Sequence, residues 1–312
     1  MDLTTVFCDI DDFCREFTLE SPQELLPTPS PRRNRRAGLG LSEIMTILVM
    51  FHHSGGHRNF KGYYTQHVCR HWSGEFPGAP SYSRLIQLVP RVLWPLLHYL
   101  GTRRGEVSGV SFVDSTPLRV CHNARIHSHK VFQGIARRGK TSVGWFFGLK
   151  LHLIISDRGD LLGIRATPGN TDDRSTVPAM AQGLSGKLFG DRGYISQKLF
   201  ESLRAQGVEL ITKLRKNMKP KLLALIDKIL LRKRALIETV NDQLKNVCQI
   251  EHSRHRSWLN ALVHLLAGLT AYTWQEKRPA LSWTAQERKN PQPDQHPAEA
   301  VAGIALSKTH VK

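Results

Sequence analysis

The chain has 312 residues, 40% of them hydrophobic and 22% charged, which is typical of a globular protein with a full core and room for a second, smaller domain. It lacks an uninterrupted apolar run of the roughly 20 residues that a membrane span requires, so the composition argues against a membrane protein. The formal net charge of +18 predicts a polyanionic partner, for which nucleic acid is the leading candidate.

The N-terminal segment carries Asp9, Asp11 and Asp12 where a signal peptide would need an apolar run. We therefore expect the protein to stay in the cytoplasm. The five cysteines are scattered along the chain without a CxxC pair, and this pattern favours reduced thiols over a disulfide framework.

Four clusters of basic residues account for much of the positive charge. They are Arg32, Arg33, Arg35 and Arg36; Arg137, Arg138 and Lys140; Lys213, Arg215, Lys216, Lys219 and Lys221; and Arg232, Lys233 and Arg234. Any one cluster is equally consistent with an ordinary solvated surface. The four together favour contact with DNA or RNA.

Residues 1–105 are expected to be helical, because apolar residues recur there at steps of three and four. Ser42 is expected to cap a helix that runs to Gly55. Pro90 and Pro95 are expected to interrupt or kink a later helix of the same region.

Residues 57–72 mix the basic residues Arg58 and Lys61 with the aromatic residues Tyr63 and Tyr64. This mixture is typical of a surface that meets a phosphate backbone, and it favours DNA contact by the helical region. The alternative is the edge of a small helical bundle with amphipathic aromatic side chains.

From about residue 109 the sequence changes to short apolar runs separated by turn residues. They predict, in chain order, a strand over 109–115, a hairpin of strands 144–156 and 161–169, a helix over 177–184, a strand over 187–191, a helix over 195–207, a strand over 208–214 and a helix over 220–252. This order predicts an α/β fold with a mixed sheet flanked by helices. After Arg278 the proline-rich sequence predicts an unstructured tail.

Three acidic residues are the main candidates for a functional site. Asp114 and Asp191 each end a short apolar strand, so two strands of one sheet can present their carboxylates side by side. Glu238 lies on the last predicted helix, beside the buried seam of that helix. Lys245 follows seven residues later on the same face, about 10 Å along the helix axis.

Three carboxylates on a rigid scaffold suit the hydrolysis of phosphodiester bonds. Two Mg²⁺ ions about 4 Å apart can activate the attacking oxygen and stabilise the leaving oxygen, and they prefer carboxylate ligands. Taken singly, Asp114 and Asp191 can be turn residues, and Glu238 can be a solvated residue paired with Arg234. Asp242, one turn further on, is the rival for the third acid.

The motifs FVDSTPL, GLKLHLIISDRGDLLGIRATPGNTDDRS, GDRGYIS and IETVNDQLK resemble those of the DDE transposases of bacterial insertion sequences, in particular the insertion sequence 982 family. The resemblance runs from about residue 1 to 278. It implies a helical, DNA-binding region over 1–105 and an RNase H-like catalytic domain over 106–278. Residues 279–312 match nothing in this pattern and are expected to be a disordered tail.

The same resemblance implies catalytic roles for Asp114, Asp191, Glu238 and Lys245, the three acids being the metal ligands. The implied metal is Mg²⁺, with Mn²⁺ able to substitute, and the implied partners are double-stranded DNA, both terminal inverted repeats and target, and further copies of the chain. The implied reaction is hydrolysis at the element ends followed by transfer of the freed 3′-hydroxyl in the bacterial nucleoid. An RNase H-like structure-selective nuclease or resolvase would need the same acids.

Other polar groups carry weaker signals. Cys248, His252 and His255 could suggest zinc, but they lack a second pair of ligands. Lys150 and His152 alternate on a predicted strand and are expected either to contact phosphate or to face solvent.

Overall fold

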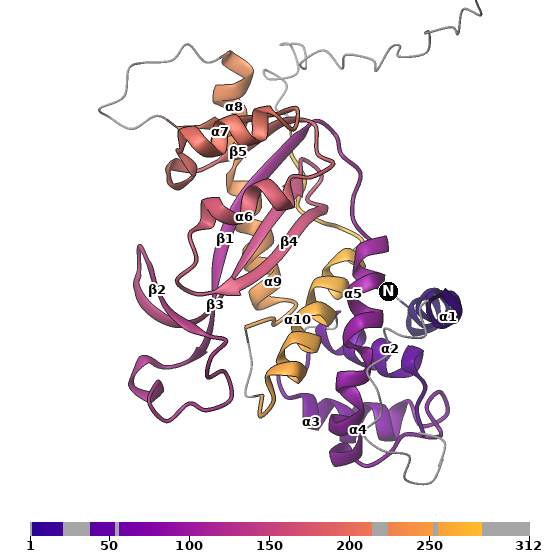
Figure 1. Ribbon diagram of the computed structural model, residues 1–312. Helices are drawn as coiled ribbons and strands as arrows, with labels where there is room; N and C mark the ends of the chain where they lie inside the picture. Colours follow the sequence, from indigo (N-terminus) through magenta and orange to yellow (C-terminus); the bar gives the residue numbers. More distant parts are fainter. Residues whose placement is uncertain (1, 21–37, 54–55, 214–223, 252–254, 283–312) are drawn as a thin grey trace, which may run out of the picture.

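The computed structural model describes residues 2–20, 38–53, 56–213, 224–251 and 255–282. A helical N-terminal region lies beside a mixed sheet that is flanked by helices (Figure 1). The first basic cluster, most of the third, His252 and the tail from residue 283 lie outside the described residues. Within the described ranges, every helix is too short or too polar to cross a membrane.

The N-terminal region packs a set of short helices around one apolar core. They are α1 Leu3–Glu20, α2 Leu41–His53, α3 Phe60–Gly62, the π-helix η2 Tyr63–His71, α4 Tyr82–Leu88, the 3₁₀ segment η3 Val89–Val92 and α5 Leu93–Thr102. Pro90 lies in η3, where the helix changes to 3₁₀ geometry, and Pro95 lies in the first turn of α5, where a missing N–H costs little.

Two expectations for this region were wrong. Ser42 lies inside α2, which begins at Leu41, and its hydroxyl donates a hydrogen bond of 2.7 Å to Asp11 Oδ1 instead of capping the helix. Tyr63 and Tyr64 are buried in the helical core, with 1% and 0% of their surface exposed. These two rings therefore stabilise the bundle and are not available to DNA.

The sheet has the strand order β4–β3–β1–β5–β6, built from β1 Val110–Cys121, β3 Gly144–Ser156, β4 Leu161–Pro168, β5 Gly186–Gly190 and β6 Val208–Thr212. β3 runs antiparallel to both of its neighbours β1 and β4, whereas β5 and β6 run parallel to β1. This connectivity is RNase H-like, as expected. A further strand, β2 Arg137–Thr141, pairs with the start of β3.

Helices cover both faces of the sheet. α6 Asp173–Met180 and α7 Gln197–Arg204 pack on one face, and α8 Leu225–Lys233, α9 Ala235–Asn246 and α10 Trp258–Thr273 pack on the other (Figure 1). Side chains alternate between the two faces along each strand. In β3, Leu151 and Leu153 therefore face α9 and α10, whereas Ile154 faces α6 and α7.

The sequence analysis misjudged two element boundaries and missed one strand. β1 continues through Pro117 to Cys121, because beyond Phe112 it has β3 on one side only and such an edge tolerates proline. The helix expected over 220–252 is divided at Arg234 into α8 and α9. The basic cluster at 137–140 forms β2, which the sequence did not predict as a strand.

α10 belongs to the helical core and to the sheet core at once. Val263, Ala267 and Ala271 pack in the N-terminal helical core. Leu269 and Tyr272 pack against the sheet. One amphipathic helix thus joins the two parts of the molecule.

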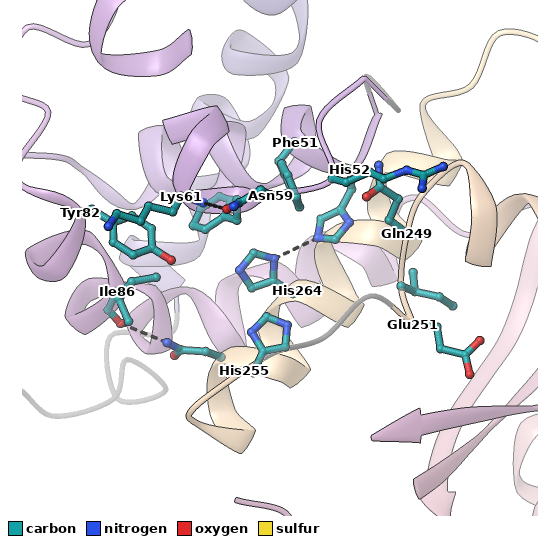
Figure 2. A pocket seen from close by; sticks show the side chains of 14 residues that line it. Phe51, His52, Asn59, Lys61, Tyr82, Ile86, Gln249, Glu251, His255 and His264 are labelled. Atoms are coloured by element: carbon teal, nitrogen blue, oxygen red, sulfur yellow. Dashed lines mark hydrogen bonds between the residues drawn. The ribbon is translucent and has the colours of Figure 1, made fainter. Parts of the chain in front are cut away.

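A pair of buried histidines crosses the same junction, beside a cavity of about 600 Å³ (Figure 2). His52 Nδ1 lies 2.6 Å from the carbonyl oxygen of Cys248, and His52 Nε2 lies 3.0 Å from Nδ1 of His264. Because a carbonyl only accepts, His52 carries its proton on Nδ1, and its Nε2 accepts from His264. Burial lowers the pKa of His52 to about 4 and the pKa of His264 well below its ordinary value.

We predict that the protein loses stability below about pH 6.5. Both histidines are neutral when folded and protonated when unfolded, so their contribution is complete above the unfolded pKa and is lost as the pH falls toward 4. For His52 alone the loss at pH 5 is about 2 kcal/mol. Urea unfolding between pH 8 and pH 5 measures it.

Two variants identify the source of this pH dependence. His52→Asn keeps a donor for the Cys248 carbonyl and should flatten the pH response, whereas His122→Asn, at an exposed position, should leave it unchanged. An equally steep response in His52→Asn would show that other groups cause it.

Candidate active site

Asp114 and Asp191 lie at matching positions on neighbouring parallel strands. The paired residues of β1 and β5 end at Phe112 and Phe189, and each acid follows two residues later. Adjacent strands are about 4.8 Å apart, so the two carboxylates emerge beside each other. The sequence analysis expected Asp114 at the end of its strand. In the structure it lies inside β1, at the point where β1 loses β5 as a neighbour.

The chain turns sharply after β5 and fixes Asp191. Oδ1 of Asp191 accepts a hydrogen bond of 2.8 Å from the backbone N–H of Gly193 and caps the short 3₁₀ helix η5 Arg192–Tyr194. One carboxylate oxygen is thereby oriented, and the other remains available to a ligand.

α9 crosses β1 and presents a polar stripe to Asp114. The helix buries Ile237, Val240 and Leu244 against the sheet. The stripe consists of Arg234, Glu238, Asn241 and Lys245, which follow one another at steps of four, three and four residues. Such steps place side chains on one face of a helix.

Three contacts connect the stripe with the acids. Asn241 Nδ2 donates to Asp114 Oδ2 at 3.2 Å. The guanidinium of Arg234 lies 3.9 Å from Asp114 Oδ1 and 2.6 Å from Glu238 Oε1. Arg234 therefore bridges the first and third acids, and the pair with Glu238 that the sequence allowed is present.

Negative charge is concentrated around Asp114. The pKa of Asp114 is raised to about 6, mainly by burial and to a smaller extent by the carboxylates of Asp191 and Glu238, whereas Arg234 and the Ser115 backbone N–H act to lower it. Both other acids thus act on Asp114 electrostatically. One guanidinium offsets only part of the charge of three carboxylates.

Asp242, the rival of Glu238, faces elsewhere. Its side chain is exposed, and its Oδ1 accepts a hydrogen bond of 2.6 Å from Asn246 Nδ2 on the same helix. Among the causes of the raised Asp114 pKa, Glu238 is present and Asp242 is not.

Lys245 lies next to the acids along β1 without pairing with them. Its Nζ donates to the carbonyl oxygen of Pro117 at 2.7 Å and lies 3.2 Å from Glu251 Oε2. Pro117 is three residues beyond Asp114, about 10 Å along an extended strand.

The sequence missed Asn241 and Tyr194. Asn241 sits three residues after Glu238 and four before Lys245, and this spacing could have identified it. The Tyr194 hydroxyl is buried near Asp114 and Asp191, and burial together with their negative charges raises its pKa. Its position at the end of GDRGY, three residues after Asp191, was the available signal.

Lys150 and His152 do not face phosphate or solvent. Lys150 Nζ lies 2.9 Å from Asp173 Oδ1, and His152, 1% exposed, donates to or accepts from Thr167 Oγ1 at 2.8 Å. Burial lowers the pKa of His152 to about 4. Both belong to a hydrogen-bonded cluster on the α6 face of the sheet.

The described residues contain no group of three or more His, Cys, Asp or Glu side chains already arranged to hold a metal ion. Cys248, one of the residues that could suggest zinc, is buried in the apolar core on the α9 and α10 face of the sheet, which does not favour a zinc site. In the acid cluster, Glu238 is turned toward Arg234.

Residues 104–258 match the model of a protein family described as transposase DDE domain. No curated protein matches the sequence. Among solved structures, the chain is similar to piggyBac transposase in a synaptic complex with hairpin DNA, with 10% identity, a TM-score of 0.47, and coverage of 86% of this chain and 72% of that one. It is also similar to a chain of the simian T-cell lymphotropic virus intasome in complex with PP2A regulatory subunit B56 gamma, with 15% identity, a TM-score of 0.26, and coverage of 71% and 75%.

The matched region contains the RNase H-like sheet, the three acids and α9 with Lys245. Over residues 104–258 the chain is therefore similar to transposase DDE domains.

Proposed function

We propose that the protein is the transposase of a bacterial insertion sequence of the 982 family. It binds the ends of the element as a homo-oligomer in the cytoplasm, hydrolyses phosphodiester bonds there and transfers the 3′-hydroxyl ends to target DNA. The observation that carries this proposal is that Asp191 and Glu238 act electrostatically on Asp114 within the region that matches the transposase DDE model. The high positive charge of the chain supports a DNA substrate.

In this proposal the three acids bind a pair of Mg²⁺ ions, for which Mn²⁺ can substitute, after Glu238 has turned from Arg234 toward the other two acids. Carboxylate oxygens are the ligands that these hard cations prefer. Burial is the main cause of the raised pKa of Asp114, with smaller contributions from Asp191 and Glu238, and a cation bound beside these carboxylates would favour their charged forms. The Arg234 guanidinium already lies between Asp114 and Glu238, so the space between them accommodates positive charge.

When bound, the metal pair would activate the attacking oxygen and stabilise the leaving oxygen. The chain orients the ligands: Asn241 holds one oxygen of Asp114, and the Gly193 N–H holds one oxygen of Asp191. To hold a metal ion, Glu238 would have to leave its ion pair with Arg234, whose guanidinium could then bind a DNA phosphate. Lys245, on the same face of α9, binds the phosphate backbone of the DNA further from the scissile phosphate.

We predict that Asp114→Asn lowers cleavage of DNA carrying the element's own ends by about 1000-fold or more, since one charged ligand of the metal site is lost. DNA binding should stay within about twofold, because the amide has the size of the carboxylate. Gel assays with Mg²⁺ and with Mn²⁺ measure cleavage and joining, and fluorescence anisotropy measures binding.

Asp12→Asn, on the exposed surface of α1, serves as the control and should cleave at the wild-type rate. Wild-type cleavage by Asp114→Asn would remove Asp114 from the site. Cleavage without joining by the wild-type protein would favour a nuclease over a transposase.

The choice of the third acid is tested by comparing Glu238→Gln with Asp242→Asn. We predict loss of cleavage in Glu238→Gln and an unchanged rate in Asp242→Asn, because only Glu238 acts on Asp114. Calorimetric titration with Mn²⁺ should show weaker metal binding in Glu238→Gln and unchanged metal binding in Asp242→Asn. The opposite result would assign the role to Asp242.

Binding to duplex DNA should depend steeply on salt. A protein that neutralises six to ten phosphates loses roughly 10³-fold or more in affinity between 50 and 200 mM salt. We predict a loss of that order in anisotropy titrations. A constant affinity over this range would contradict contact between the basic clusters and phosphates.

A further inference from the structure

The β2–β3 hairpin projects from the sheet away from the helical layers (Figure 1). Apolar side chains are exposed near its turn, with 85% of Val143 and 60% of Trp145 accessible to solvent. Large exposed apolar residues on a projecting ribbon indicate a binding surface.

The part of the chain that carries the exposed ring is rich in positive charge. Residues 115–156 contain no Asp or Glu but seven Lys and Arg residues: Arg119, Arg125, Lys130, Arg137, Arg138, Lys140 and Lys150. Lys140 lies directly opposite Trp145 in the ladder, with its Nζ 5.7 Å from the centre of the indole ring. The partner of such a surface is expected to be anionic and able to pack against an aromatic ring.

A cavity of about 360 Å³ lies beside Trp145 and is lined by Arg119, His122 and Asn123 among others. Asn123 Nδ2 donates to the carbonyl oxygen of Trp145 at 2.9 Å and so ties the hairpin to the short 3₁₀ segment η4 Asn123–Arg125. One side of the indole thus faces open space bordered by hydrogen-bonding groups, which suits the edge of a nucleobase.

Trp145 and the candidate active site share one face of the sheet. Asp114 pairs with Leu153, and Trp145 lies eight residues before Leu153 on β3, an even separation. Arg138 and Lys140 pair with Phe147 and Trp145 and therefore point to the same face. Eight residues span about 26 Å of strand.

A distance of about 26 Å corresponds to about eight nucleotides at 3.4 Å each along one DNA strand. A DNA strand whose scissile phosphate lies at Asp114 can therefore reach Trp145. The major groove of DNA admits a two-stranded β-ribbon of this kind.

We propose that the β2–β3 hairpin enters a groove of the bound DNA about eight nucleotides from the scissile phosphate. Trp145 packs against a base there, and Arg138 and Lys140 bind the adjacent phosphates. This inference rests on the proposed function. It adds to it a second contact with the DNA, made by the hairpin outside the active site.

The test measures affinity for a duplex carrying the element end at fixed salt. Trp145→Ala should weaken binding at least fivefold, because contact between a base and an aromatic ring is lost, and Trp145→Phe should restore most of it. The double variant Arg138→Ala with Lys140→Ala should lower the salt slope by about two. The matched control, Lys198→Ala with Arg204→Ala on α7, removes two exposed cations from the opposite face and should leave affinity and slope unchanged.

A scan of single abasic nucleotides locates the contact. In the wild type, removal of the base about eight nucleotides from the cleaved phosphate should weaken binding, and Trp145→Ala should be insensitive at that position alone. Unchanged affinity of Trp145→Ala, or equal sensitivity of both proteins at every position, overturns the inference. Thermal melting confirms that each variant is folded.

Other outcomes separate the hairpin from the proposed function. If Trp145→Ala changes the oligomeric state in sedimentation and not the DNA affinity, the surface is a protein interface and the inference is wrong. If Trp145→Ala binds and cleaves like the wild type while Asp114→Asn does not cleave, the hairpin role fails and the transposase stands. If the wild-type protein does not bind DNA at all, the proposed function fails with it.

Discussion

The burial of the Asp114 carboxylate next to other charged side chains is the constraint on which the candidate site depends. Asp114 and Asp191 lie where β1 loses its parallel neighbour, and burial is the main cause that raises the pKa of Asp114 to about 6. Packing of α9 on the sheet supplies the free energy that holds these charges together, since Ile237, Val240 and Leu244 are buried on its apolar side. Arg234 pairs with Glu238 and lies near Asp114, so it offsets part of this negative charge.

The hairpin and the acid cluster form one surface in this view. The strands that carry Asp114 and Trp145 pair along most of their length, so the face on which the acids lie continues to the projecting ribbon. Residues 115 to 156 contain no Asp or Glu, so the charged side chains that these strands themselves supply are all basic. Catalysis and DNA positioning would therefore share the rigidity of one sheet.

The sequence predicts those features that depend on local periodicity. The order of strands and helices follows from apolar spacing, and the seam of α9 identifies the face that carries Glu238 and Lys245. Features set by distant partners were missed: β1 extends past Asp114 because β3 pairs with it, and Tyr63 is buried because other helices cover it. Asn241 acquires its role only from Asp114, 127 residues away in the sequence.

The position of α10 in both cores affects how the chain folds during its synthesis. His52 meets His264 across 212 residues, and the first helical core contains side chains from near the end of the described chain. A ribosome releases the N-terminal helices long before α10 exists, so their apolar surfaces stay incompletely covered during translation. The part of the chain made first thus completes its core among the last, when closure of this long loop brings α10 into place.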